Sequence, residues 1–172
     1  HTASVYGPGF VVLAAAGTGA TGSSVLATRL FWQGLEALAL GGVLLILWRR
    51  TRDPVALAFV GLNPAMIAVL NGGHNDILVG LALLGGALLL ADDHPRRAGV
   101  VLALGALVKL VVILPIGALL VWAWFRRTKR AAVELAVTLG VILVGAYLAA
   151  GGRTAIEPLL SASSQRSRSS IW

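Results

Sequence analysis

The sequence predicts an all-α integral membrane protein, a multi-pass helical bundle with short helical hairpins. Three observations predict this fold class. The 172 residues are 58% hydrophobic and 12% charged, a more apolar composition than the roughly 50% of ordinary soluble domains. Long runs of Leu, Ala, Val and Gly lack the period-two alternation of a transmembrane barrel. Short basic loops separate these runs, as in helical membrane proteins.

The net charge of +7 is interpreted through membrane topology. Nine of the 14 basic residues fall in three short loops, at residues 49–52, 96–97 and 126–130. Such loops mark the cytoplasmic side of a membrane protein. A nucleic-acid partner is not expected, because no basic helical stripe or interleaved aromatic pattern is present. The sequence contains no cysteine, which excludes disulfide and thiolate chemistry.

Residues 1–24 are expected to form an external loop rich in Gly, Thr and Ser. The apolar run Phe10–Ala16 is far shorter than the roughly 20 residues of a membrane span, so it predicts a re-entrant or interfacial segment. The first span is predicted near residues 25–48, followed by basic residues that place its far end in the cytoplasm. We interpret the chain as a fragment, because it starts without Met and stops within a Ser- and Arg-rich stretch.

Two shorter apolar segments follow, near residues 55–70 and 77–91. Each gives a helix about 22–24 Å long, less than the roughly 30 Å of the hydrocarbon core. Asn63 is suited to cap a new turn that Pro64 begins, which interrupts the first segment. The pair therefore predicts a hairpin whose turn lies below the outer membrane surface. Polar backbone at that depth requires a protein interior or a wet cavity.

A second hairpin is predicted from segments near residues 98–109 and 110–125, because basic loops flank the pair on both sides. The alternative is one long tilted span, which would place one basic loop outside. A last span near residues 131–150 returns to the outside, and residues 151–172 are expected to form an external loop. The transmembrane bundle thus covers residues 25–150, with two long and four short helical segments.

The turn between the first two short helices, Asn71-Gly72-Gly73-His74-Asn75-Asp76, is the most informative stretch for function. Its glycines permit close approach of a ligand, and ionisable residues at membrane depth indicate a functional site. The structural alternative is a simple capped turn, with Asn75 or Asp76 capping the following helix. His74 and Asp76 could ligate a metal, but no third ligand is evident, so we expect no metal and no cofactor.

Lys109 stands alone in an apolar segment, where an unpaired ammonium would cost several kcal/mol. It requires a carboxylate such as Asp76 or an anionic ligand such as a phosphate; the alternative is snorkelling to the interface. Glu134, in contrast, is expected to pair with the nearby basic loop.

Arg29, Gln33 and Glu36 share one helix face, since they are four and three residues apart. A substrate-binding role and an internal Arg–Glu contact that orients helix packing are equally consistent with this spacing. Tyr6 presents a phenol from a Gly- and Pro-rich turn. A group of residues is therefore expected at the outer side, where it suits a phosphate-bearing lipid ligand: Tyr6, Arg29, His74, Asn75, Asp76 and Lys109.

Several of these motifs resemble the GT-C glycosyltransferases that use polyprenyl-phosphate-mannose. Their order is similar to that of bacterial α-mannosyltransferases that build lipomannan-type envelope glycans, over roughly Tyr6 to Arg130. The motifs are the loop His1-Thr2-Ala3-Ser4-Val5-Tyr6-Gly7-Pro8, Arg29 in the next span, Asn63-Pro64, Gly73-His74-Asn75-Asp76, and Ala106-Leu107-Val108-Lys109.

The resemblance implies transfer of mannose from a polyprenyl-phosphate-linked donor to an envelope glycan or glycolipid acceptor, on the external face of the cell membrane. Lys109 and Arg29 would offset charge on the departing phosphate, Tyr6 would line the sugar pocket, and His74 and Asn75 would contact sugar or phosphate. The usual catalytic acid of this family lies in the first external loop. That loop would precede His1, so the fragment is expected to lack the catalytic acid. Asp76 is a weak catalytic candidate and is assigned to binding or orientation.

Two other classes of protein remain open from the sequence. A transporter or flippase for a lipid-linked or anionic substrate also uses broken helices and intramembrane charges. Such a protein should show an internal repeat and charges near mid-depth, whereas the polar residues here favour one side. In a non-catalytic assembly subunit, the same polar residues would only hold helices together.

Overall fold

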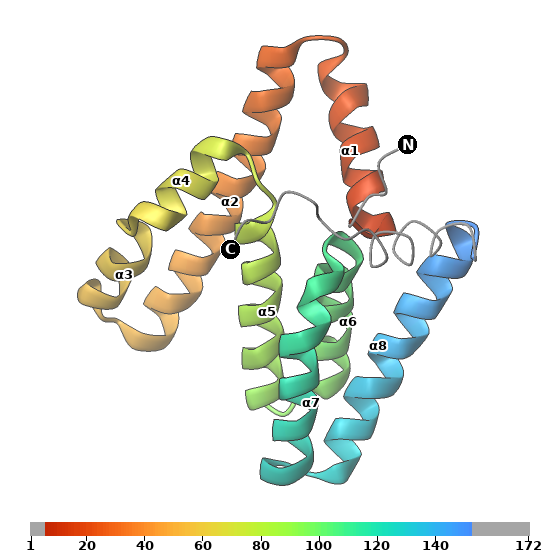
Figure 1. Cartoon of the computed structure of the whole chain (residues 1–172). Helices are drawn as coiled ribbons and strands as arrows, with labels where there is room; N and C mark the ends of the chain where they lie inside the picture. The colour runs from red at the N-terminus through yellow and green to blue at the C-terminus, as the bar shows by residue number, and fades with distance from the viewer. Residues whose placement is uncertain (1–5, 153–172) are drawn as a thin grey trace, which may run out of the picture.

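The structure is a computed structural model that describes residues 6–152. Within these residues, the named elements are eight α-helices and one 3-10 helix, η1. Figure 1 shows α5, α6, α7 and α8 as a bundle, with α1 and α2 forming a hairpin that extends above it and α3 and α4 lying along α2. The elements are α1 (Pro8–Thr21), α2 (Val25–Thr51), α3 (Pro54–Gly61), α4 (Pro64–Gly72), α5 (Asp76–Ala91), α6 (Pro95–Val108), η1 (Leu110–Val112), α7 (Ile113–Arg126) and α8 (Lys129–Ala149).

Local sequence explains where most of these helices begin. A proline starts α1, α3, α4 and α6, a position where its missing N–H costs no hydrogen bond. At four helix starts, the side chain of the N-cap residue accepts a hydrogen bond from a backbone N–H. These residues are Ser24, Asp53, Asn63 and Thr128. Asn63 accepts from the N–H of Ala65 at 2.9 Å, which confirms the predicted break at Asn63-Pro64.

The N-terminal segment differs from the expected loop. The apolar run Phe10–Ala16 belongs to a helix of 14 residues, α1, which continues through Gly17, Thr18 and Gly19 to Thr21. Thr18 and Thr21 donate their hydroxyls to carbonyl oxygens one turn earlier, at 2.9 and 2.8 Å. The backbone therefore satisfies these hydroxyls, and the polar composition does not end the helix. Its re-entrant or interfacial position stays a prediction, and residues 153–172 of the expected C-terminal loop lie outside the described residues.

Two helices, α2 and α8, are long and apolar enough to cross a membrane. The number rises to three if α3 and α4 form one span, bent by 47° at their junction. Shorter apolar helices are found at α1, at α5 and over residues 110–126. Helices are thus observed over the segments expected at residues 25–48 and 131–150 and over the shorter segments between them, and their passage through a membrane stays a prediction.

The core lies where α5, α6 and α8 meet, around the fully buried Leu102 and Leu135. Glycines allow the helices to approach closely. A Cβ atom at Gly86 of α5 would lie 2.4 Å from Cγ of Leu102, and one at Gly99 of α6 would lie 3.1 Å from the carbonyl oxygen of Leu135. Small residues at helix crossings are typical of membrane bundles, where close contact drives association.

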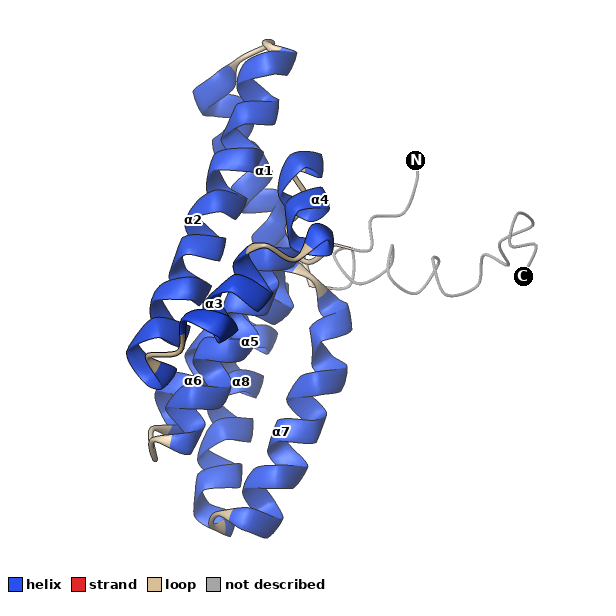
Figure 2. Cartoon of the chain, turned by 90° about the vertical axis from the view of Figure 1, so that its left-hand side faces the viewer, coloured by secondary structure: helices blue, strands red, loops and turns tan. Residues whose placement is uncertain are grey.

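The chain reverses direction at Lys109, as the second predicted hairpin requires. The α-helix α6 ends at Val108, Lys109 is extended with φ −143° and ψ 111°, and α7 begins at Ile113. Figure 1, coloured along the chain, shows α6 and α7 running in opposite directions, and Figure 2 shows them as separate helices. The alternative of one long tilted span is therefore excluded. Pro115 lies in the first turn of α7 and does not kink its middle.

The three basic loops lie toward the lower side of Figures 1 and 2, with the α7–α8 loop at the bottom and the α2–α3 loop higher, at the left. Ion pairs connect two of them to the α5–α6 loop, which directly precedes the third: Arg50 pairs with Asp92 and Arg127 pairs with Asp93. Hydrogen bonding from the Arg50 guanidinium holds the pKa of the Asp92 carboxyl below its usual value. The clustering that the charge pattern predicted for these loops is thus found in the structure.

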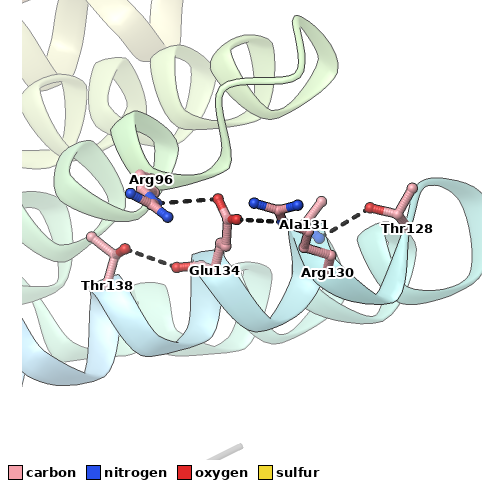
Figure 3. Close-up of polar contacts among 6 residues, drawn as sticks. All are labelled: Arg96, Thr128, Arg130, Ala131, Glu134 and Thr138. Carbon is pink, nitrogen blue, oxygen red and sulfur yellow. Dashed lines mark hydrogen bonds and ion pairs between the residues drawn. The ribbon is translucent and has the colours of Figure 1, made fainter.

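Glu134 connects two of these loops, as expected for a structural residue. Its carboxylate accepts from Nε of Arg130 at 2.9 Å and from Nε of Arg96 at 3.2 Å, as Figure 3 shows. Glu134 lies in α8, and Thr128 caps the start of this helix by accepting from the N–H of Ala131 at 3.0 Å. The start of α8 is therefore tied to the start of α6.

Tryptophans accompany the cations at this end of the bundle. Arg52 lies 5.3 Å from the ring centre of Trp48, Arg127 lies 5.4 Å from Trp122, and Lys129 lies 5.5 Å from Trp124. Each Trp is partly exposed, at 38–45%. Indole rings beside basic side chains are typical of the boundary between hydrocarbon and water.

Candidate functional site

The turn between α4 and α5 lies at the end of the bundle opposite the basic loops (Figure 1). Gly73 ends α4 in the left-handed region, with φ 64° and ψ 34°, a conformation that glycine adopts without cost. Asp76 is the first residue of α5. The turn therefore holds His74, Asn75 and Asp76 within three positions, directly before the positive end of a helix dipole.

Asp76 and Lys109 form an ion pair that joins the two hairpin turns. The Lys109 side chain is 27% exposed and the Asp76 side chain is 47% exposed, so the pair is accessible from outside the protein. Of the partners expected for Lys109, the structure shows the carboxylate of Asp76. Lysine has three donors, so the pairing with Asp76 leaves capacity to bind an anionic group.

Tyr6 lies beside Lys109, because the residues around Gly7 pair with the end of α6. Tyr6 and Lys109 form an isolated antiparallel bridge, and the N–H of Gly7 donates to the carbonyl oxygen of Val108 at 3.3 Å. A Cβ atom at Gly7 would lie 2.3 Å from the carbonyl oxygen of Leu107. Only glycine permits this approach, which brings the N-terminal turn to the site.

An aromatic stack extends from Tyr6 toward α2. The rings of Tyr6 and Phe10 are stacked with centres 4.2 Å apart, and those of Phe10 and Trp32 are stacked at 5.4 Å. This stack links the N-terminal turn, α1 and α2, and it fixes the position of Tyr6 near the ion pair.

His74 and Asn75 differ in their surroundings. His74 is exposed, and its ring covers Gly72, where a Cβ atom would lie 2.5 Å from Cδ2 of the imidazole. Asn75 is 4% exposed, and its Nδ2 has no hydrogen-bond partner among the described residues. A buried donor without an acceptor is costly. The Asn75 Nδ2 group is therefore suited to donate to an oxygen atom that the described residues do not supply, such as one of a ligand.

The cap of α5 comes from another helix. Asn75 occupies the N-cap position but forms no side-chain cap bond, so the simple capped turn considered from the sequence is wrong. Glu36 of α2 is fully buried, and its carboxylate accepts from the N–H of Ile77 at 2.9 Å and of Leu78 at 3.4 Å. Sequence reasoning missed this role, although the polar stripe on α2 had marked the residue.

Arg29 lies apart from both Glu36 and the ion pair. Of the two alternatives left open for this helix face, the internal contact between Arg29 and Glu36 is not found: Glu36 binds the backbone of α5, and no ion pair joins the two described side chains. Arg29 is exposed and lines a separate hollow of about 370 Å³ together with Trp32, Gly72 and Gly73. It shares the end of the bundle with Lys109 but not the same pocket.

Two apolar hollows are lined by residues of the ion pair or by their neighbours in sequence. The larger, about 610 Å³, lies between α1, α2, α5 and α6, and its wall includes Leu78, Leu107 and Val108. These residues immediately precede Lys109 or closely follow Asp76 in sequence. A second hollow, about 400 Å³, lies between α2, α3, α4 and α5 and includes Asp76 in its wall. The charged pair is thus next to space suited to hydrocarbon chains.

The described residues contain no group of three His, Asp or Glu side chains that could hold a metal ion. What the site presents is an accessible ammonium held by a carboxylate, a phenol, an imidazole and a buried amide donor. This set can bind anionic and hydroxyl-rich groups, with apolar space beside it.

Fold and site together define a helical protein with membrane-span candidates and a polar site at one end of its bundle. Residues 5–166 match the model of Glycosyltransferase family 87, and the chain belongs to this family. The resemblance to GT-C mannosyltransferases is thereby confirmed.

The chain is similar to alpha-(1->6)-mannopyranosyltransferase A of Mycobacterium tuberculosis (strain ATCC 25618 / H37Rv). The two are 29% identical over 141 residues, a match that covers 75% of this chain and 26% of the relative. The chain therefore spans about a quarter of the length of that protein. No solved structure matches the chain.

Proposed function

We propose that the protein containing this chain transfers mannose from a polyprenyl-phosphate-linked donor to an envelope glycan or glycolipid acceptor, at the external face of the cell membrane. Membership of a glycosyltransferase family and similarity to a mannopyranosyltransferase support the transfer of mannose. The observation that carries the proposal is the accessible Asp76–Lys109 pair beside the apolar hollow of about 610 Å³.

This juxtaposition matches the chemistry of the donor. A polyprenyl-phosphate sugar combines a hydrocarbon chain, one negative phosphate and a sugar with several hydroxyls. Lys109 offers a cation for the phosphate, and the hollow next to Leu107 and Val108 offers an apolar wall for the chain. Asn75, His74 and Tyr6 supply polar groups for the sugar.

In the proposed reaction, an acceptor hydroxyl attacks the anomeric carbon and the bond from that carbon to the phosphate oxygen breaks. The phosphate leaves with the electron pair, and Lys109 offsets its charge, which lowers the barrier. Asp76 holds the ammonium in place through the ion pair. Because Arg29 lines a separate hollow, we assign the phosphate to Lys109. None of the site residues named above is assigned as the base that takes the acceptor proton.

The proposed orientation makes the chain a multi-pass unit, in which α2, the bent pair α3–α4 and α8 are spans and the shorter α5, α6 and α7 carry the chain between the two faces. The basic loops then face the cytoplasm, in agreement with the positive-inside rule and with the three Trp–cation contacts. In the full-length protein with other cysteines replaced, Ser23→Cys in the α1–α2 turn should be labelled by an impermeant thiol reagent added outside intact cells. Arg97→Cys should react only after the cells are opened. The reverse pattern would contradict the orientation.

The function is tested by transfer from polyprenyl-phosphate-mannose with the purified full-length protein. Lys109→Ala should lower kcat by about 10²–10³-fold, the usual cost of removing one charge-stabilising group. Lys129→Ala is a matched control, because the second lysine of the sequence lies at the basic end beside Trp124. It should retain the rate of the unaltered protein.

Equal rates for the two lysine variants would overturn the assignment of the site. A protein that moves the lipid-linked sugar across vesicles without transferring it would instead be a transporter. Asp76→Asn provides a second check, since loss of the carboxylate should weaken donor binding by freeing Lys109 from its position.

A further inference from the structure

The α4–α5 turn is held by polar side chains of α2 that the proposed reaction does not use. Glu36 is fully buried within a long apolar helix, where an uncompensated charge would be costly. Its compensation is the start of α5, where both carboxylate oxygens accept backbone N–H groups, from Ile77 at 2.9 Å and from Leu78 at 3.4 Å. The positive end of the helix dipole adds to this stabilisation.

Gln33 lies one turn earlier on the same face of α2 and holds the other end of the turn. Its Nε2 donates to the carbonyl oxygen of Asn71 at 2.8 Å. Between the two contacts, a Cβ atom at Gly73 would lie 3.2 Å from Cβ of Trp32. The turn therefore meets α2 at its first residue, in its middle and at its end.

We propose that Gln33 and Glu36 form a clamp that positions residues 71–78 for sugar transfer. These two are positioning residues, because they touch the backbone of the turn and act through Asp76 and its neighbours. The kinetic part of this inference rests on the proposed function. Its structural part, the immobilisation of the turn by α2, does not.

The physical need for such a clamp follows from the turn itself. It contains two adjacent glycines, which give the unfolded backbone the most freedom to lose. Asn75 supplies no side-chain cap for α5, so removal of Glu36 leaves the first N–H groups of the helix without their acceptor. Fraying of that first turn would displace Asp76, because it is the first residue of α5.

The kinetic test compares Glu36→Ala, Glu36→Gln and Gln33→Ala in the full-length protein, per folded molecule. Glu36→Ala should lower kcat for mannose transfer by about tenfold or more, comparable to the loss of one hydrogen bond to a charged group. Glu36→Gln keeps one oxygen acceptor and should recover part of this loss. Because Lys109, the proposed phosphate-binding residue, is unaltered, KM for the donor should change less than kcat.

Glu134→Gln is the matched control for these substitutions. Glu134 also accepts hydrogen bonds through its carboxylate, but it binds Arg96 and Arg130 at the opposite end of the bundle. Its replacement should leave kcat per folded molecule unchanged. An equal loss in Glu134→Gln and Glu36→Ala would show a general effect on folding and would overturn the clamp.

A spin label at His74→Cys measures the turn without any need for activity. The position is exposed, and the label should become more mobile in Glu36→Ala than in the parent, while Glu134→Gln should leave its spectrum unchanged. An unchanged spectrum in Glu36→Ala overturns the clamp. If Glu36→Ala makes the label more mobile but leaves kcat unchanged, the clamp has no role in the reaction. If the parent transfers no mannose, the proposed function fails, and the label still decides whether α2 immobilises the turn.

Discussion

The Gly7→Ala substitution tests how the N-terminal turn is joined to the site. The added Cβ would lie 2.3 Å from the carbonyl oxygen of Leu107 and 2.9 Å from its carbonyl carbon. Both atoms belong to the backbone, so no rotamer change relieves the contact. Gly7 has φ −78° and ψ 173°, a conformation that alanine adopts freely. The cost of the substitution is therefore steric.

Its magnitude follows from two terms. Forcing one extra carbon into a close-packed site costs about 1–3 kcal/mol. The shift that relieves the contact also lengthens the hydrogen bond from the N–H of Gly7 to Val108, which is already 3.3 Å long, and a bond of this kind contributes about 0.5–1.5 kcal/mol. We expect a loss of about 2–4 kcal/mol in the free energy of unfolding.

Gly19→Ala is the matched control, because Gly19 lies in α1 and a Cβ atom there meets nothing within 4 Å. This substitution should stabilise the helix by about 0.5–1 kcal/mol. Thermal unfolding of the full-length protein in detergent should thus shift in opposite directions for the two variants. Transfer activity should also fall in Gly7→Ala, because Tyr6 and Lys109 move apart. Indistinguishable unfolding midpoints for the two variants would refute the steric argument.

Two further predictions concern the loops. Asn63→Ala removes the side-chain acceptor at the start of α4 and should cost about 1 kcal/mol in thermal unfolding, with Asn63→Asp retaining the cap and most of the stability. Arg50 lowers the pKa of Asp92, so this carboxyl stabilises the fold above the usual pKa of an aspartate, about 4. That contribution disappears as the pH falls through the lowered folded pKa. The difference in unfolding midpoint between the parent and Asp92→Asn should therefore shrink on acidification, and a constant difference would contradict the assignment.

The path of the chain could be predicted because its determinants are local. Short apolar segments flanked by basic loops required hairpins, and the structure reverses at Lys109 as expected. Asn63 and Pro64 specify a helix start through their own side chains. The partner of Lys109 was also predictable, since an ammonium in an apolar segment needs a carboxylate and Asp76 ends the neighbouring turn.

The role of Glu36 could not be predicted in the same way. Its contact with Ile77 joins residues 41 positions apart, and the nearer cation on its own helix face, Arg29, offered an equally good local explanation. Whether Glu36 pairs with Arg29 or with the start of α5 depends on which side chains become buried when α2 packs against α5. Similarly, the Gly and Thr residues that continue α1 past Ala16 favour a loop by composition, whereas the hydroxyls of Thr18 and Thr21 are satisfied within the helix.

Short helices also explain why polar residues gather at this end of the bundle. Where α5 begins and α6 ends, backbone groups lose their intrahelical partners, and water would be scarce there in the proposed orientation. Glu36 satisfies N–H groups of α5, and the N–H of Gly7 reaches the carbonyl of Val108 at the end of α6. Asp76 and Lys109 stand at the helix ends whose dipoles favour their charges. The same interruption of the helices that requires polar partners therefore creates the charged, accessible position at which we propose that the donor phosphate binds.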